Sequence, residues 1–505
     1  MPSRNRIEDQ IIYSKIAAAN RHAGEQLQRI SRSSVLAEAR AYAVGTLTPT
    51  GGLAHQVQGQ AEHLFALRSS SQAIFDRFAF DIEEGDVLIS GDVFGGGTKG
   101  QMLTMVLPFF IDGELAFTPA IRAQMTDLAG EYPGGYHPVA FETWQESMRI
   151  TPTKLYTGGK LRRDVLRFLL ANSRTPDILS SDLDAMLASL RQAQSSLRAI
   201  VNSYGISRVA EAVEGMIAHT AAQTAEAIPF GHTLSELTVD GQSAVKAGAE
   251  EIAVRVRLHR QDARLFFDFA GSSAQVEAPF NSSPETVKAC AVIALMADPL
   301  NELPINDGLL DAFSFEMPAG SIVNPEFPAA TSLGFETSGQ AVAAAVTSAL
   351  NEGAGQQEKF AAVGGMAPLT VLYSPLGSRE QTSILFLEPG FSSAEGVSGP
   401  PSLLGGRRLV SAEELERRDG LRMTGRELAE DGGTMQVRIE VLNGEWEATL
   451  FAPEGAERAG EMISAERDGR RWQGTVAGLS VLRGTVIQYT YGSGISKKER
   501  EGEAR

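Results

Sequence analysis

The stretch that decides the fold is FETWQESMRITPTKLYTGGKLRRDVLRFLLANSRTPDILSSDL, which runs from Phe141 to Leu183. Residues 151–156 are predicted to be extended, because a proline in the second position biases its predecessor away from helix. A glycine pair at 158–159 predicts a turn, and apolar residues then recur at helical spacing through 160–171. The proline within 172–177 ends that helix, since proline lacks a backbone donor. The residues alone therefore indicate a strand, a turn and successive helices that connect larger units.

Two long helices follow this stretch, and after them the spacing of the apolar residues changes from that of a helix to that of a strand. The helices are predicted at 178–204 and 207–228, with Gly205 between them as a C-terminal stop. Apolar and polar residues then alternate through 252–258, which is typical of a half-exposed strand, and the chain turns back into a second strand at 265–269. Further helices are expected at 285–297 and 340–350, and further strands at 435–442, 447–452, 471–476 and 485–491.

On the N-terminal side, an amphipathic helix is predicted at 7–34 and a short buried strand at 86–90. The strand leads into the glycine-rich sequence GDVFGGGTKG at 91–100, and a strand pair is expected at 102–110 and 115–123. A glycine-rich turn after a strand can bind phosphate through its backbone N–H groups. The signal is weak here, because the chain contains no G-x-x-x-x-G-K-[ST] motif.

Composition narrows the class of protein. The 505 residues include 45 Lys and Arg against 62 Asp and Glu, a net charge of −17, which argues against nucleic acid as a partner. The single cysteine, Cys290, permits no intramolecular disulfide and is expected to pack in the core. Acidic residues precede any apolar run at the N-terminus, and no apolar run is long enough to span a membrane. We therefore expect a soluble, cytoplasmic protein that handles small molecules.

Several phrases resemble the hydantoinase B/oxoprolinase family. They are RITPTKLY at 149–156, LANSRTP at 170–176, DFAGSS at 268–273 with PFN at 279–281, PAGSIVNP at 318–325 and GFETS at 334–338. That family supplies one subunit of ATP-dependent cyclic-amide hydrolases and of the biotin-independent acetone and acetophenone carboxylases. The resemblance is good over residues 7–350 and poor over 360–490.

The resemblance implies a multidomain α+β fold of the hydantoinase B type. It implies mixed β-sheets with a barrel-like β region, a helical segment at about 160–230, and glycine-rich segments of polyproline type. We expect an N-terminal α/β region at 1–140, a helical region at 141–235, a sheet-and-helix region at 236–360 and a β-rich region at 361–505.

The chain departs from the family where the resemblance implies metal ligands. The family motif N-D-P-x-x-G-G-T-H-x-x-D is matched by Asp92 and by Thr98, but Lys99 and Met102 stand where ligands are expected. A paired histidine is replaced by residues 124–125, Gln-Met, and only Asp127 is kept. An ammonium, a thioether, an amide and one carboxylate do not hold a transition metal. We therefore predict no metal at this site, and expect the ammonium of Lys99 to pair with Asp127 instead.

Residue-by-residue transfer from the family gives a candidate site with no metal. A reacting pocket is expected where the 92–99 loop, the 124–130 segment, His63 and the 268–281 signature meet. Purely structural roles for these residues also stay open. A lone histidine is most often structural, and the negative charge of Glu336 suits the N-terminus of a helix. The expected catalytic residues are His63, Asp92, Lys99 and Asp127, and the expected substrate-binding residues are Thr98, Gln124, Asp268, Asn281 and Glu336.

Three functions remain open at this point. The first is a subunit of an ATP-dependent heteromer that hydrolyses cyclic amides or carboxylates ketones, with ATP and Mg²⁺ used by a hydantoinase A-type partner and no cofactor bound by this chain. The second is a catalytically inactive scaffold or regulatory subunit of such a complex. The third is an independent binding protein. A hetero-oligomer is expected, because the glycine-rich segments 91–100 and 388–406 contain little core of their own and need covering.

Overall fold

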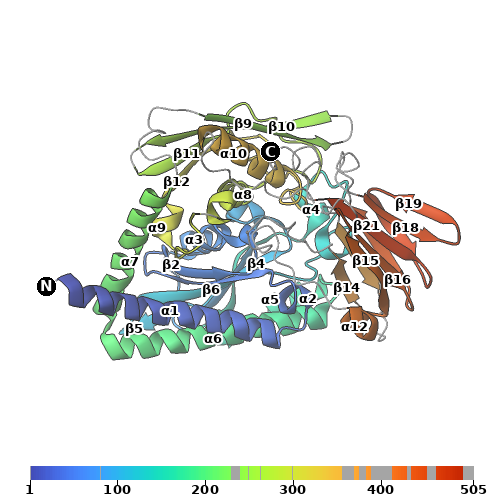
Figure 1. Cartoon of the computed structure of the whole chain (residues 1–505). Helices are drawn as coiled ribbons and strands as arrows, with labels where there is room; N and C mark the ends of the chain where they lie inside the picture. Colours follow the sequence, from blue (N-terminus) through green and yellow to red (C-terminus); the bar gives the residue numbers. More distant parts are fainter. Residues whose placement is uncertain are drawn as a thin grey trace.

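The computed structural model describes residues 2–79, 81–228, 239–247, 250–261, 263–297, 299–354, 369–374, 383–387, 412–428, 434–451 and 462–492. The strands of this part of the chain form four β-sheets, and helices pack between and below these sheets (Figure 1). Within these ranges, no helix combines the length and the apolarity needed to cross a membrane.

The largest sheet has eight strands, and the segment 141–183 contributes the strands at one edge of it. Its order is β2-β1-β6-β4-β3-β7-β8, with β5 paired to β6, and every pair is antiparallel. The predicted extended segment is therefore confirmed as strand β7. The strands are β1 (Tyr42–Leu47), β2 (Leu53–Gln58), β3 (Val87–Gly91), β4 (Met102–Val106), β5 (Phe109–Ile111), β6 (Glu114–Gln124), β7 (Ile150–Thr157) and β8 (Lys160–Leu161).

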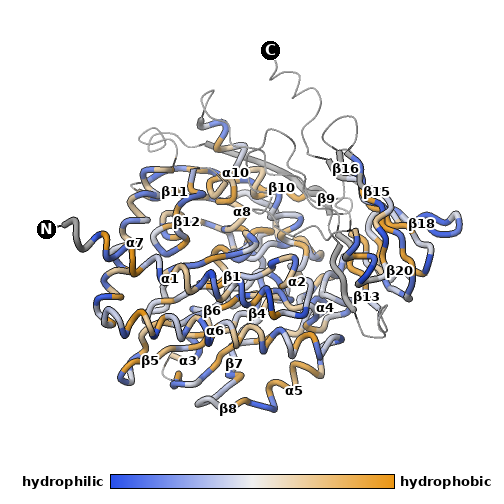
Figure 2. The backbone as a smooth tube through the Cα atoms, turned by 60° about the horizontal axis from the view of Figure 1, so that its bottom comes forward, coloured by the Kyte–Doolittle hydropathy of each residue, from blue (hydrophilic) through white to orange (hydrophobic). Residues whose placement is uncertain are grey.

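Both faces of this sheet are buried, because its strands are apolar on both sides. Leu103 and Ile121 point to one face and pack with helices α1 (Pro2–Ile30) and α6 (Pro176–Tyr204), which lie side by side below the sheet in Figure 1. Val106 and Ala120 point to the other face, toward helices α3 (Ala66–Phe78) and α8 (Pro284–Ala297). In Figure 2, hydrophobic and hydrophilic segments alternate along α6, as expected for a helix with one buried face.

A second sheet covers the helices on the upper face. Its order is β12-β11-β10-β9, and helix α10 packs against β9 and β10 while also contacting α8 (Figure 1). Only the β11–β12 pair is parallel. The elements are β9 (Val239–Ala247), β10 (Glu250–Gln261), β11 (Arg264–Asp268), β12 (Phe313–Glu316) and α10 (Ser338–Ala354).

The C-terminal region contains two further sheets, with the orders β14-β13-β17-β20 and β15-β16-β21-β18-β19. Leu372, Trp446 and Tyr489 belong to their shared core. The sheets of the described residues are open, so the predicted barrel-like region is not a closed barrel. The strands are β13 (Leu369–Ser374), β14 (Ser383–Leu387), β15 (Leu421–Leu428), β16 (Thr434–Val441), β17 (Trp446–Phe451), β18 (Met462–Arg467), β19 (Arg470–Gln473), β20 (Val476–Val481) and β21 (Val486–Gly492).

Most predicted helices are confirmed, although their ends differ by a few residues; the helix expected at 340–350, for example, is α10 (Ser338–Ala354). The helix expected at 160–171 begins later, as α5 (Arg163–Ala171), because Lys160–Leu161 first pair with β7 around the Gly158–Gly159 turn. The helix expected at 7–34 ends at Ile30, and Ser33 then caps a new turn. The remaining elements are α2 (Ser34–Ala37), η1 (Ala61–His63), η2 (Val93–Gly95), η3 (Pro133–Gly135), α4 (Thr143–Glu146), α7 (Ile206–Ala227), α9 (Asp307–Leu310), α12 (Ala412–Glu414) and η4 (Leu415–Asp419).

Candidate functional site

The glycine-rich loop after β3 is fixed by Asp92. Its carboxylate accepts a hydrogen bond from the Phe94 N–H at 3.1 Å and two more, both at 2.9 Å, from the Arg149 guanidinium. Gly96 adopts a φ of 85°, and a Cβ on Gly97 would lie 2.6 Å from the Asp92 carbonyl oxygen. Only glycine fits this tight turn, which carries the chain inward toward Thr98 and Lys99.

Lys99 is buried between two carboxylates. Its side chain is 4% exposed, and its Nζ lies 3.1 Å from Glu62 Oε2 and 3.4 Å from Glu336 Oε1. The same Nζ donates a hydrogen bond to the Tyr136 hydroxyl at 2.9 Å. Burial by itself would lower the pKa of Lys99, but the charges of Glu336 and Glu62 outweigh it and hold that pKa well above its ordinary value. Lys99 is therefore a permanent ammonium.

A second buried cation, Arg122, lies on β6 close to Lys99. Its guanidinium donates to the Thr98 hydroxyl at 2.9 Å and to the Thr104 hydroxyl at 3.2 Å. Burial lowers the pKa of Arg122 to about 10, although Glu62 and Glu285 oppose that shift. The guanidinium therefore stays charged at neutral pH.

His63 is a neutral imidazole in this setting. Burial holds its pKa well below the ordinary value, and the charges of Arg122 and Lys99 lower it further. The backbone of Ala41 partly opposes the shift, but neither ring nitrogen reaches an acceptable hydrogen-bond geometry. The neutral ring therefore keeps one nitrogen that can accept a hydrogen bond.

Several buried polar atoms around Lys99 have no hydrogen-bond partner. Arg122 and Gln124 share one face of β6, since side chains two apart in a strand point the same way. Buried polar groups in proteins are almost always paired, so atoms left without a partner mark places where a ligand or water binds. These atoms are Glu62 Oε1, both ring nitrogens of His63, Arg122 Nε and both side-chain amide atoms of Gln124.

Only some of the residues at the expected metal positions lie together, and they do not fit a metal. Met102 pairs with Gln124 across β4 and β6, and the N–H of Met102 donates to the Lys99 carbonyl at 3.2 Å. Met125 packs in the core on the opposite face. A thioether, an amide and an ammonium are poor ligands for a transition metal. Among the described residues, no three His, Cys, Asp or Glu side chains come together as a possible metal site.

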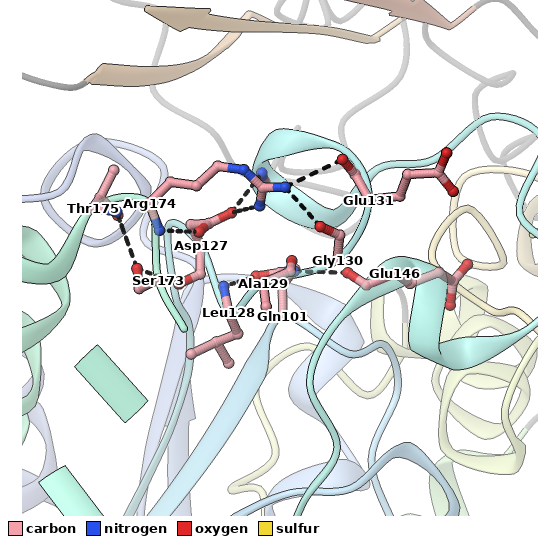
Figure 3. Close-up of polar contacts among 11 residues, drawn as sticks. Gln101, Asp127, Leu128, Ala129, Gly130, Glu131, Glu146, Ser173, Arg174 and Thr175 are labelled. Atoms are coloured by element: carbon pink, nitrogen blue, oxygen red, sulfur yellow. Dashed lines mark hydrogen bonds and ion pairs between the residues drawn. The ribbon is translucent and has the colours of Figure 1, made fainter. Parts of the chain in front are cut away.

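The expected pairing of Lys99 with Asp127 is wrong, because Asp127 pairs with Arg174 (Figure 3). The buried carboxylate accepts from the Arg174 N–H at 2.6 Å, from the Arg174 guanidinium at 3.1 Å and from the Gly134 N–H at 3.2 Å. The guanidinium also donates to the Gly130 carbonyl at 2.7 Å. Arg174 belongs to the phrase LANSRTP, so this phrase ties the segment after β6 to the start of α6.

Asp268 and Asn281 also make contacts other than those expected of a substrate site. Asp268 accepts a hydrogen bond from the Ala270 N–H at 2.8 Å and shapes the turn after β11. Asn281 is fully buried, and its amide group bonds the backbones of Val276, Ala278 and Ala330, each at 2.9 Å. Both side chains hold the signature loop in shape.

The structure thus brings one part of the predicted site together. Lys99 contacts Glu336 directly, and the preceding residue, Thr98, accepts a hydrogen bond from Arg122. His63 follows Glu62, which pairs with Lys99, and Gln124 shares one face of β6 with Arg122. Asp92, Asp127, Asp268 and Asn281 bond elsewhere. The sequence analysis missed Glu62, Arg122 and Tyr136. An arginine within the apolar run of β6 was a usable signal, since a charged residue is seldom buried without a partner.

Glu146 connects α4 to the segment that carries Glu336. Its buried carboxylate accepts hydrogen bonds from the Thr331 N–H at 2.9 Å and from the Ser332 N–H at 2.8 Å. Burial raises the pKa of Glu146 to about 7, although these backbone donors oppose the shift. The folded protein therefore holds a proton on Glu146 that the unfolded chain releases at lower pH.

We expect the Glu146→Gln variant to flatten the pH dependence of stability. The folded-state pKa of about 7 lies above the ordinary 4.5, so this group's contribution is fully present below about pH 4.5 and is lost as the pH rises through 7. Urea unfolding at pH 5 and at pH 7.5 measures the difference for both proteins. Glu142→Gln, which removes a half-buried carboxylate beside α4, is the control. An unchanged slope in Glu146→Gln would show that Glu146 is ionised throughout.

Residues 5–435 match the hydantoinase B/oxoprolinase family, and the chain belongs to it. Caprolactamase subunit beta of Pseudomonas jessenii is 27% identical over 68% of this chain and 60% of its own length. 5-Oxoprolinase 1 of Arabidopsis thaliana is 26% identical over 61% of this chain and 26% of its own length. The chain thus spans about a quarter to three fifths of these curated relatives.

Two solved structures share the fold. The ATP-dependent caprolactamase from Pseudomonas jessenii superposes with a TM-score of 0.84 and 21% identity, over 96% of this chain and 91% of that chain. The nucleotide-free acetone carboxylase superposes with a TM-score of 0.83 and 15% identity, over 97% of this chain and 75% of that chain. The predicted hydantoinase-B-like fold is confirmed.

Proposed function

We propose that the chain is the hydantoinase-B-type subunit of an ATP-dependent heteromeric enzyme that acts on the carbonyl group of a small molecule. The reaction is either hydrolysis of a cyclic amide or biotin-independent carboxylation of a ketone. The observation that carries the proposal is the buried cluster of Lys99, Glu62, Glu336 and Arg122, with unpaired donors and acceptors beside it. Family membership and the names of the relatives support it.

The cluster supplies what an activated carbonyl intermediate needs. Lys99 and Arg122 provide fixed positive charge out of contact with water, where it stabilises a developing oxyanion most strongly. Arg122 Nε and the Gln124 amide are free to donate to the substrate oxygen, and the neutral imidazole of His63 is free to accept a hydrogen bond. Asp92 and Asp127 then act by positioning the loop and the segment that frame this cluster.

The partner in this proposal is a hydantoinase A-type subunit that binds ATP with Mg²⁺ and activates the substrate. The caprolactamase relative is named as a beta subunit, which supports an assembly of unlike chains. The present sequence contains no phosphate-binding loop of the G-x-x-x-x-G-K-[ST] type. ATP chemistry is therefore assigned to the partner, and sheltering of the reacting carbonyl to this chain.

One observation favours a second candidate, an inactive scaffold. The Lys99 ammonium is already bonded by Glu62, Tyr136 and Glu336, as in a purely structural ion-pair cluster. In that case these side chains would make no contribution to the turnover of the complex. The two candidates differ in what happens when Glu336 is neutralised inside the assembled enzyme.

The test is turnover of the co-purified complex. It is assayed for ATP-dependent release of amino acid from lactams, hydantoins and 5-oxoproline, and for ATP- and bicarbonate-dependent carboxylation of ketones. Glu336→Gln is compared with Glu326→Gln, which removes an exposed carboxylate nearby. If this chain takes part in the chemistry, only Glu336→Gln lowers kcat. Equal turnover in both variants would establish the scaffold, and activity on neither substrate group would reject the proposal.

The partner surface is proposed from three exposed aromatic residues and one half-buried one, here called the aromatic patch: Phe141, Trp144 and Phe327 with Phe94. The Phe327 ring meets Trp144 at 5.1 Å and Phe94 at 5.4 Å between ring centroids. Phe141, Trp144 and Phe327 are among the large apolar side chains that remain exposed. Phe94 lies in the loop that carries Lys99, so a partner seated on the patch would reach the cluster from outside. Apolar surface of this kind marks interaction sites.

We expect the Phe141→Ser/Trp144→Ser variant to lose the partner subunit. Both rings are about half exposed, so the folded chain tolerates the change, while truncating aromatic anchors costs an interface about 2 kcal/mol or more each. Recovery of the partner on a tagged chain measures the effect. The matched control is Phe168→Ser on α5, an exposed aromatic residue outside the patch. Full partner recovery by the double variant would place the interface elsewhere.

A further inference from the structure

The side-chain amide of Gln124 is buried with both of its polar atoms unpaired. Gln124 is the last residue of β6 and is 0% exposed. Neither its amide oxygen nor its amide nitrogen has a hydrogen-bond partner among the described residues. A glutamine amide offers acceptor and donor atoms side by side, and leaving them buried without partners costs free energy. The arrangement therefore indicates a ligand that presents a donor and an acceptor on one edge.

Gln124 lies in the wall of the buried cluster described above. Its backbone N–H donates to the Ala41 carbonyl at 2.9 Å, and the backbone of Ala41 also interacts with the His63 ring. Arg122 comes two residues earlier on the same face of β6 and donates to the Thr98 hydroxyl at 2.9 Å. The Nε of Arg122 is a further buried donor without a partner. A ligand bound by the Gln124 amide would therefore lie beside the positive charge of Arg122.

The amide group of a small ring matches this pair of atoms. A small ring holds its amide bond cis, so that the N–H and the C=O point to the same side, whereas open-chain amides are trans and point them to opposite sides. A cis amide can therefore donate to the oxygen and accept from the nitrogen of one glutamine at the same time. A ketone or an N-substituted lactam can only accept, and would leave the Gln124 oxygen buried and unpaired.

We propose that Gln124 is a specificity-determining residue that binds the N–H and the C=O of a cyclic secondary amide together, with Arg122 Nε as a further donor in the same site. This role rests on the proposed function and, within it, favours the cyclic amide over the ketone as substrate. Because Gln124 is fully buried, a ligand reaches it only when the site opens, as in enzymes that close over their substrates.

The test measures ligand binding to the co-purified complex by ligand-detected NMR titration. The probes are 2-pyrrolidone, N-methyl-2-pyrrolidone and cyclopentanone, which share a five-membered ring and differ at the amide edge. We expect wild type to bind 2-pyrrolidone at least about tenfold more tightly than the other two, because those leave a buried acceptor unpaired. Gln124→Met keeps the length of the side chain but removes both polar atoms, and should lose this preference. The control, Gln192→Met, changes a half-buried glutamine on α6 and should keep it.

Gln124→Met should fold with a Tm no lower than that of wild type, since it removes unpaired polar atoms from the interior. If it did not fold, the wild-type series alone would decide. Wild type that binds all three probes equally, or none of them, would overturn the proposal, as would a preference that survives in Gln124→Met. Carboxylation of ketones by a complex without the lactam preference would reject only this role of Gln124. A preference that depends on Gln124, in a complex that turns over neither substrate group, would support the role and reject the proposed function.

Discussion

Replacing Lys99 by methionine lowers the free energy of unfolding by about 3–5 kcal/mol, the typical cost of removing one partner from a buried ion pair. Methionine has a similar length and no charge, so packing changes little while Glu62 and Glu336 lose their counter-ion. The two carboxylates then repel each other in a site that water hardly reaches. Urea and thermal unfolding of the purified chain measure the loss.

Two companion variants show that the loss comes from the buried charges. Lys99→Met/Glu62→Gln should recover part of the stability, since only one carboxylate is then left without a cation. Lys288→Met removes a partly exposed lysine that pairs with Glu285 three residues earlier, and should cost no more than about 1 kcal/mol. A loss in Lys99→Met no larger than in Lys288→Met would mean that the cluster is not held together by the Lys99 ammonium.

Asp127→Ala should be the second strongly destabilising change, and it should lower the free energy of unfolding by about 3 kcal/mol or more. It leaves the N–H groups of Gly134 and Arg174 without their acceptor, and it leaves the Arg174 guanidinium without its carboxylate. Asp127→Asn keeps an acceptor oxygen and should lose less. The measured quantity is again the free energy of unfolding, with circular dichroism to follow the transition.

The comparison for Asp127 is Asp164→Ala, which breaks an ion pair with Arg162 on the surface. That pair is fully exposed, so we expect no resolvable change in stability. If Asp127→Ala also retained full activity in the complex after correction for its folded fraction, Asp127 would be a positioning residue only. Wild-type stability in Asp127→Ala would contradict the role that the Arg174 contact assigns to it.

Local elements could be predicted from the sequence because their causes are local. The proline at 152 and the glycine pair at 158–159 specify β7 and its hairpin, and helical spacing specifies α6 and α7. The family phrases led to the correct fold because they identify a family whose match spans residues 5–435. The predicted domain ranges stay predictions. The segment 388–406, expected to need covering, lies outside the described residues.

The surroundings of Lys99 could not be predicted, because they depend on contacts between distant residues. Lys99 meets Tyr136 and Glu336 across 37 and 237 residues of sequence. No spacing rule connects such positions, and several carboxylates could have been its partner. Asp127 was the expected partner because it alone was kept among the residues expected as metal ligands in that region, but it pairs with Arg174 before the start of α6. Strand order likewise places β1 beside β6, which no local pattern reveals.

The most direct test of the account is purification of the tagged chain from its own host, followed by ATP turnover measurements on the separated and recombined components. We predict that a second, ATP-binding chain co-purifies and that substrate-dependent ATP hydrolysis requires both chains. The isolated chain should bind no ATP at micromolar concentrations in calorimetry. A stable monomer that retains no partner, or ATP hydrolysis by this chain alone, would contradict the account.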